Sequence, residues 1–133
     1  MSLIFDLFRH DPCFVTIMAG KHLFRENERS EKKMYALFSG VADILINDRL
    51  VEKALPGSIV GEMGIVEPDQ PHATSVCADS NCEFGEIDLR RFELIVAAAP
   101  FFALEIMRKI AHRQRAIDRL LDQAPAQHPP AAS

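Results

Sequence analysis

The chain has 133 residues, of which 48% are hydrophobic and 26% are charged. This length fits one compact domain, because domains usually run to about 100 to 150 residues, and it excludes a multidomain enzyme. The composition supplies enough apolar residues for a core, which excludes wholesale disorder. A formal net charge of −4 argues against a dedicated non-specific nucleic-acid binder.

The cysteines and the hydropathy give little sign of an extracellular or membrane-spanning chain. Cys13, Cys77 and Cys82 are odd in number and lack the paired spacing of a zinc site, so we expect reduced thiols and no structural metal. No apolar run reaches the ~18 residues of a membrane span, and Asp6 interrupts the short apolar start. We therefore expect a cytoplasmic protein.

The first residues have the apolar spacing of a helix, and the residues after them have that of strands. An apolar face formed by Leu3, Ile4, Leu7 and Phe8 predicts a short helix that begins near Ser2. From residue 14 the pattern changes to short strands, which we expect over 14–18, 22–24, 34–39, 41–46, 49–51, 58–60, 73–78 and 82–87.

Turn residues separate these strands. Asn47 and Asp48 both tolerate a positive φ, so they predict a two-residue hairpin turn. Many short strands at close spacing favour a small antiparallel barrel or jelly roll, in a fold that is mainly β with flanking helices.

Two helices are expected to follow the strands. Asp88 is a suitable N-cap for a helix that reaches Ala98, and Pro100 separates it from a second helix over about 101–122. Residues 123–133 are rich in Ala and Pro without apolar periodicity, which predicts a disordered tail after a domain at 1–122.

The segment from residue 56 to residue 76 carries the most specific chemistry. Gly61 and Gly64 allow tight turns, and a helical turn beginning near Glu62 leaves amide N–H groups free to meet an anion. The Glu62 carboxylate can accept hydrogen bonds from a sugar hydroxyl beside that anion. These residues predict a phosphate cradle next to a hydroxyl site.

This segment resembles the phosphate-binding cassette of cyclic-nucleotide-binding domains, the family of catabolite-activator-type regulators and kinase regulatory subunits. The resemblance covers nearly the whole chain and includes Gly61-Glu62, the glycines at 20, 40 and 57, the strand segment 34–40 and the order helix, barrel, helix, helix. In the family an E-G-D or E-G-E turn precedes that strand, and here it reads Glu26-Asn27-Glu28. Asn is the best replacement for Gly at a left-handed position, so we expect the turn to persist.

The resemblance implies a non-catalytic ligand-sensing module for a cyclic nucleotide, cAMP or cGMP. The implied cassette spans Gly61–Thr74, and its binding residues are Val60, Gly61, Glu62, Met63, Gly64, His72, Ala73 and Thr74. The amides of Met63, Gly64, Ala73 and Thr74 would hold the phosphate and Glu62 the ribose. The last helix would then dock over the pocket through a population shift.

His72 stands where the family places an Arg that grips the phosphate. Loss of a charge-assisted hydrogen bond costs about 1.5 to 3 kcal/mol, which predicts roughly 10- to 100-fold weaker binding. Free imidazole titrates near pH ~6.5, so we expect binding to tighten as the pH falls. In the alternative interpretation His72 is an ordinary exposed loop residue. The degenerate domain then binds no nucleotide and acts as a dimerisation or protein-interaction module.

The last helix has two interpretations. Its apolar seam of Ile106, Ile110, Ile117 and Leu120, interrupted by Arg113, has the spacing of a coiled coil, but a helix packed on its own barrel shows the same spacing. The family resemblance favours a homodimer through residues 101–122. It also implies that Ile117 and Asp118 cap the purine base.

The basic residues of this helix do not indicate a nucleic-acid site. They are Arg108, Lys109, Arg113, Arg115 and Arg119. Acidic residues dilute their charge, which favours a solvated and partly ion-paired face. No recognition helix follows, so we expect a stand-alone sensor that makes no direct contact with nucleic acid and acts through an unknown protein effector.

A small jelly roll could also be a metalloenzyme, but the histidines argue against this alternative. His10, His22, His72, His112 and His128 are isolated and form no metal-ligand pair. The sequence also lacks a nucleophile elbow, a Cys-His arrangement and a Walker loop. We therefore expect no catalysis, no metal and no cofactor other than the cyclic nucleotide ligand.

Overall fold

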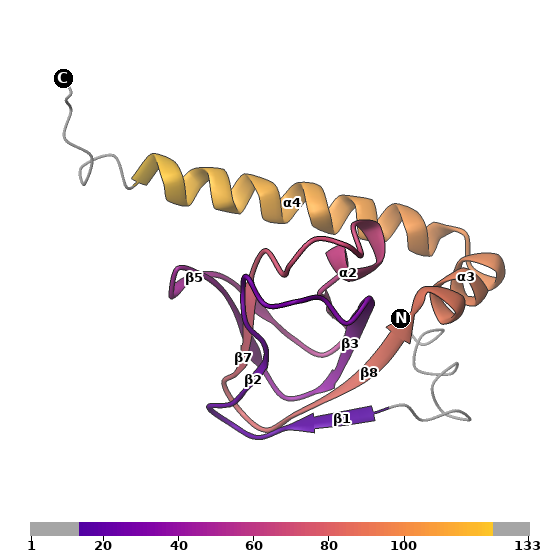
Figure 1. Ribbon diagram of the computed structural model, residues 1–133, viewed down its shortest axis with the longest axis horizontal. Helices are drawn as coiled ribbons and strands as arrows, with labels where there is room; N and C mark the ends of the chain where they lie inside the picture. Colours follow the sequence, from indigo (N-terminus) through magenta and orange to yellow (C-terminus); the bar gives the residue numbers. More distant parts are fainter. Residues whose placement is uncertain (1–13, 124–133) are drawn as a thin grey trace.

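The computed structural model describes residues 14–123 as two antiparallel sheets with helices along one side (Figure 1). The strands are β1 Phe14–Ile17, β2 His22–Phe24, β3 Lys33–Ser39, β4 Ala42–Ile46, β5 Arg49–Ala54, β6 Ile59–Val60, β7 Ser75–Ala78 and β8 Cys82–Asp88. The helices are α2 Met63–Val66, α3 Leu89–Ala98 and α4 Phe101–Gln123.

The strands pair in the orders β1-β8-β3-β6 and β2-β7-β4-β5. The prediction of a mainly β fold with two C-terminal helices is confirmed for the described residues. Helix α4 ends at Gln123, one residue beyond its predicted end. The predicted N-terminal helix, and the predicted tail after Gln123, lie outside the described residues.

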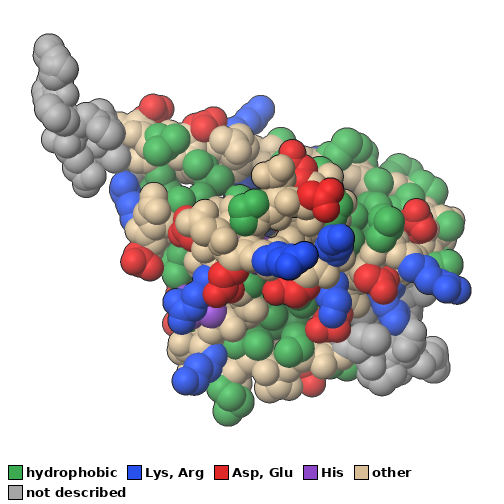
Figure 2. Space-filling view, viewed as in Figure 1, with side chains coloured by type: hydrophobic (Ala, Val, Ile, Leu, Met, Phe, Trp, Pro, Cys, Tyr) green, Lys and Arg blue, Asp and Glu red, His purple; other side chains and the backbone are tan. Residues whose placement is uncertain are grey.

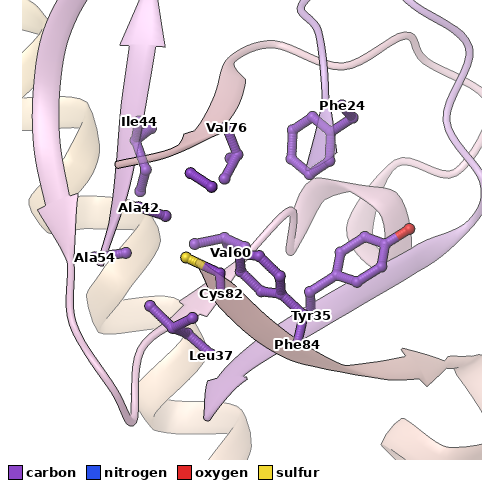
Figure 3. Close-up of a cluster of buried hydrophobic side chains, with 11 residues drawn as sticks. Phe24, Tyr35, Leu37, Ala42, Ile44, Ala54, Val60, Val76, Cys82 and Phe84 are labelled. Carbon is purple, nitrogen blue, oxygen red and sulfur yellow. The ribbon is translucent and has the colours of Figure 1, made fainter. Parts of the chain in front are cut away.

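Strand β3 is buried on both faces, because it separates two hydrophobic clusters. Tyr35 and Leu37 point between the sheets, into the cluster drawn in Figure 3. Met34 and Ala36 point the other way, into a second cluster beneath α3 and α4. Successive side chains of a strand alternate between its two faces, so β3 contributes to both clusters at once.

The local signals in the sequence are confirmed where the structure describes them. Asn47 and Asp48 have φ values of 52° and 63°, as a two-residue hairpin between β4 and β5 requires. Asn27 has a φ of 70°, so it replaces glycine at a left-handed position. The Asp88 side chain caps α3 by accepting a hydrogen bond from the Arg91 amide at 2.9 Å.

Helix α4 lies across one end of the two sheets and passes over α2 (Figure 1). Its beginning is anchored by Phe102 and Ile106, which are buried in the second cluster, and it also contacts β5. Figure 2 shows charges of both signs interspersed over the visible face. Within residues 14–123, no helix has both the length and the apolar character of a membrane span.

Candidate functional site

A cavity of about 150 Å³ lies between the cassette and α4. One wall is formed by β2, α2 and the segment before β7, and the other wall is formed by α4. Its lining residues are Phe24, Gly61, Glu62, Met63, His72, Ala73, Thr74, Ile110, Arg113, Gln114 and Ile117. The sequence-predicted cassette therefore borders a cavity whose other wall is α4.

Two glycines shape the turn that leads into α2. Gly61 has a φ of +70°, and a side-chain carbon there would approach the Phe24 ring to 3.0 Å. A side-chain carbon at Gly64 would meet the Lys33 carbonyl oxygen at 2.2 Å, closer than real contacts allow. Glycine is therefore required at both positions for the chain to turn tightly and pack against β3.

Three backbone amides of the cassette remain available. Among residues 14–123, the N–H groups of Met63, Ala73 and Thr74 have no hydrogen-bond acceptor. The Gly64 N–H, in contrast, donates to the Gly61 carbonyl at 3.0 Å. Because backbone N–H groups carry partial positive charge, the three available amides can meet an anion, whereas Gly64 contributes to the turn instead.

Glu62 is a buried carboxylate, only 4% exposed, with one oxygen paired and one unpaired. Its Oε2 accepts a hydrogen bond from Nη1 of Arg113. Its Oε1 is buried and has no partner among the described residues. A buried polar atom without a partner is rare, because its desolvation is not compensated. Glu62 is therefore a buried residue of the cavity and not a solvated loop carboxylate.

Arg113 of α4 joins two carboxylates. Besides Glu62, its Nε donates to Oε1 of Glu52 on β5 at 3.1 Å, and its Nη2 lies 3.5 Å from the Ile59 carbonyl. Burial alone lowers the pKa of the guanidinium, but the charges of Glu62 and Glu52 outweigh this effect and raise it. Arg113 is therefore permanently charged at the edge of the cavity.

The expectation that Arg113 belongs to a solvated basic face is wrong, because the residue is 6% exposed. The signal that could have found it was present in the sequence, since a single Arg interrupts an apolar seam. A buried arginine needs carboxylate partners, and the nearby cassette supplies Glu62. The pairing could not be predicted because Glu62 and Arg113 are 51 residues apart in the sequence.

His72 is also buried, so its interpretation as an ordinary exposed loop residue is wrong. Its ring stacks on Phe24, with the ring centroids 3.8 Å apart and the planes 6° apart. Its Nε2 lies 3.1 Å from Oε1 of Glu31, and its backbone bonds to Asn27 and Glu28. The ring is held as part of the cavity wall, with one nitrogen already engaged.

Glu31 links His72 to Tyr35, which lies in the cluster between the sheets. The Tyr35 hydroxyl lies 3.5 Å from the same Oε1 of Glu31. Burial raises the pKa of Tyr35, and the negative charges of Glu31 and Glu86 raise it further. The Tyr35 phenol is therefore neutral throughout the physiological range.

The structure brings together most of the sequence-predicted site residues. Gly61, Glu62, Met63, His72, Ala73, Thr74 and Ile117 line the cavity. Val60 does not, because its side chain is fully buried in the cluster between the sheets. Gly64 packs against β3 instead, and Asp118 is exposed and accepts a hydrogen bond from the Gln114 side chain at 3.1 Å.

Gln114 and Ile110 also line the cavity, although the sequence analysis gave neither a binding role. Ile110 was recognised as part of an apolar seam. Gln114 carried no signal, because one polar residue on a long amphipathic helix looks like any exposed residue. The rotation of α4 about its own axis, as it lies over the two sheets, decides which of its residues face the cavity.

The thiols and carboxylates of residues 14–123 form no metal site. No three of the described His, Cys, Asp and Glu side chains lie close enough to hold a metal ion. Cys82 is buried, and burial raises the pKa of its thiol, with the charge of Asp79 acting in the same direction. Cys82 is therefore a core residue with little thiolate character.

The cyclic nucleotide-binding domain family matches residues 14–98, which include the whole cassette and every described strand. The chain belongs to this family. The match confirms the family resemblance seen in the sequence.

Individual relatives agree with this assignment. The cAMP-activated global transcriptional regulator CRP of Salmonella typhimurium is 25% identical over 95 residues, which are 68% of this chain and 45% of that protein. The Pycsar effector protein XpPycTIR of Xanthomonas perforans is 28% identical over 93 residues, or 70% of this chain and 29% of that protein. The chain thus spans less than half the length of these curated relatives.

A solved structure shows the same fold. The structure of cAMP-bound PfPKA-R superposes with a TM-score of 0.70, at 17% identity, over 80% of this chain and 36% of that chain. The curated relatives are named for regulatory and effector roles, and the PfPKA-R structure is described as cAMP-bound.

Proposed function

We propose that this protein is a non-catalytic regulatory module of the cytoplasm that binds a cyclic nucleotide, cAMP or cGMP, weakly in the Gly61–Thr74 cassette. The observation that carries the proposal is the buried, unpaired Oε1 of Glu62, a residue that lines the cavity together with Met63, Ala73 and Thr74, whose N–H groups have no acceptor among the described residues. A ligand with a hydroxyl donor beside an anionic group satisfies both features, and a cyclic nucleotide has this pattern in its ribose and phosphate.

The chain's own residues would divide the recognition between them. The amides of Met63, Ala73 and Thr74 would donate to the phosphate oxygens, while Glu62 accepts from the ribose hydroxyl. Base recognition would fall to α4, where Ile117 offers apolar contact. Gln114 can donate and accept through its amide, so it is a better candidate for the purine edge than the exposed Asp118.

The surroundings of His72 support weak binding. Its Nε2 faces Glu31 and not a free position in the cavity, so the phosphate lacks a permanent cationic partner there. Arginine would supply a planar fork and could stack on Phe24 as the imidazole does. The expected cost of the natural His72 is roughly 10- to 100-fold in affinity.

Isothermal titration with cAMP and with cGMP tests the proposal. We expect weak binding by the wild type, loss of binding in Glu62→Ala, and 10- to 100-fold tighter binding in His72→Arg. Glu67→Ala removes an exposed carboxylate five residues further along and serves as the matched control. Runs at pH 6 and pH 7.5 test whether binding tightens as the pH falls, which a protonated imidazole requires.

A second candidate is a degenerate domain that binds no nucleotide and serves as a dimerisation or protein-interaction module. The ion pair of Arg113 with Glu62 favours it, because the hydroxyl acceptor is engaged within the chain. Silence in both the wild type and His72→Arg supports this candidate. Binding by His72→Arg but not by the wild type supports an intact pocket that has lost the cationic side chain for the phosphate.

We further infer that the two sheets form the predicted jelly roll, since eight strands in two packed sheets match that architecture.

A homodimer through residues 101–122 is also part of the proposal. The predicted seam faces its own barrel at Ile106 and Arg113, so the dimer contact would use the exposed side that carries Leu104 and Met107. Sedimentation velocity would measure this association. The proposal also includes a protein effector that responds to the bound ligand.

A further inference from the structure

The outward face of α4 carries a line of basic side chains. Helix α4 lies across one end of the sheets, so one of its faces is turned toward them and the opposite face points away (Figure 1). Basic residues recur at steps of four, three and four along the outward face, and all of them are exposed: Arg108, His112, Arg115 and Arg119. Residues three and four apart share one side of a helix, so these side chains form one line about 16 Å long. Lys109 lies beside the line, and we call these five residues the basic strip.

The basic strip reverses the charge of the rest of the chain. Residues 101–123 hold five of the 15 Lys and Arg residues and three of the 19 Asp and Glu residues, a balance of +2. The remaining 10 basic and 16 acidic residues give −6. A basic strip on an acidic protein attracts an acidic partner at one place and disfavours it elsewhere, so it supplies orientation as well as attraction.

The chain does not neutralise the basic strip itself. The sequence favoured a partly ion-paired face, but within residues 14–123 no carboxylate forms a salt bridge with the Lys or the three Arg residues of the strip. Asp118 is next to Arg119 in the sequence, yet it accepts a hydrogen bond from the Gln114 side chain at 3.1 Å instead. The charges of the strip are therefore available to a partner.

One end of the basic strip borders a hollow between α4 and β5. The hollow measures about 340 Å³, and its lining residues are Glu52, Arg108, Lys109 and His112. The charge of Glu52 is already offset, because its Oε1 accepts from Nε of Arg113 at 3.1 Å. Arg108 and Lys109, which no described carboxylate pairs, therefore dominate the hollow. It has room for a side chain that ends in a carboxylate.

Other anionic or like partners fit this surface less well. A helix that binds a membrane surface inserts its apolar face, but α4 buries Phe102 and Ile106 against the rest of the chain. An extended polyanion such as a nucleic acid would also meet the acidic remainder of the protein. A second copy of the strip would bring like charges together. A short acidic segment of a protein avoids these costs.

We propose that the basic strip is a docking surface for an acidic segment of a protein partner, whose Asp or Glu side chains recur at steps of three and four, with one of them seated in the hollow. Arginine suits this role, because its planar fork can donate two hydrogen bonds to one carboxylate. The inference rests on the proposed function only in giving the protein effector a chemical class. The basic strip does not line the cassette cavity, so its test needs no nucleotide.

Fluorescence anisotropy with labelled model peptides tests the proposal. The probe is an Ala-rich helical peptide of about 20 residues with four Glu residues at steps of four, three and four. The control probe has the same composition, with its Glu residues spread around the helix. We expect the wild type to bind the aligned peptide about threefold or more tightly than the control peptide, and less tightly as salt rises. Absence of binding, or equal binding of both peptides, would overturn the proposal.

Removal of charge from the protein supplies the second test. Arg108→Gln combined with Arg115→Gln should weaken binding of the aligned peptide by about fivefold or more, because two cations leave the basic strip. Lys21→Gln combined with Arg90→Gln removes two exposed cations elsewhere and is the matched control. Equal effects in the two double variants would show diffuse attraction and reject the surface.

The same assay separates the other polyanions from an acidic protein segment. A labelled DNA duplex and vesicles that contain an anionic lipid are titrated beside the aligned peptide. We expect both to bind more weakly than the peptide at equal salt. Tighter binding of either one, lost when Arg108 and Arg115 are replaced, would assign the strip to that polyanion and overturn the proposal.

Discussion

The charged residues around the cavity form two small units with different roles. In one, Arg113 joins Glu62 and Glu52 across the boundary between α4 and the sheets. In the other, Glu31 joins His72 and Tyr35. Glycines and a carboxylate in one segment indicated a phosphate cradle, and the family resemblance identified that segment as the cassette. They could not indicate the partners of Arg113 or the pairing of His72 with Glu31, because these residues lie 41 to 61 positions apart in the sequence.

The buried ion pair should show strong coupling in a double-mutant cycle. Arg113→Met leaves Glu62 buried without its partner, and we expect a loss of about 3 to 5 kcal/mol in the free energy of unfolding. Adding Glu62→Gln removes the stranded charge, so the double variant should recover at least ~1 kcal/mol. Urea unfolding at pH 7 measures the free energy of unfolding of the wild type, of each single variant and of the double variant. Additive losses would show that the two side chains do not interact.

Tyr35 should make the protein sensitive to alkali. Its pKa is raised in the folded state, so above its unfolded value of about 10 the unfolded chain holds fewer protons than the native one. Its contribution is complete below about pH 10 and is lost as the pH rises further, by up to ~1.4 kcal/mol per pH unit. We expect Tyr35→Phe to lose less stability than the wild type between pH 9 and pH 11. Parallel losses in urea unfolding would contradict this.

At the scale of the elements, local chemistry predicted most of what the structure contains. The hairpin at Asn47-Asp48, the left-handed Asn27 and the Asp88 cap follow from side chains acting on their own backbone. Strand positions followed from the apolar period. The rotation of α4 did not, because the 3.6-residue period fixes only which residues share a face and not what that face contacts.

The hairpin offers a direct test of the turn assignment. Both turn residues have positive φ, a conformation that costs an L-residue energy and glycine little. We expect Asp48→Gly to stabilise the protein by roughly 0.5 kcal/mol, the small net of relieved strain and added unfolded-state entropy. Asp48→Ala should destabilise it. Equal unfolding midpoints for the two variants would show that the turn is not under this constraint.

At the scale of the whole molecule, binding should appear as stability. A ligand that binds only the native state adds about 2.7 kcal/mol at a concentration 100 times its Kd. Thermal unfolding with increasing cAMP or cGMP should therefore raise the Tm of the wild type, and raise it further in His72→Arg at equal concentration. Glu62→Ala should show no shift. A shift of the same size in Glu62→Ala would place the ligand elsewhere on the protein.

The family and the order of the elements could be read from the sequence because glycine turns, strand lengths and the cassette occur together in one register. The contacts made by the side chains around the cavity could not. It depends on Arg113 meeting Glu62 and on His72 stacking against Phe24, and both contacts arise only when segments far apart in the sequence fold together. The site was thus predictable as a set of residues, but its occupancy by the chain's own side chains was not.

Strand β3 contributes alternate residues to two clusters, and we expect this arrangement to make unfolding cooperative. Loss of β3 would empty the space between the sheets and also expose the underside of α3 and α4. Neither layer can melt alone, so we expect one heat-absorption peak in calorimetry, with equal calorimetric and van't Hoff enthalpies.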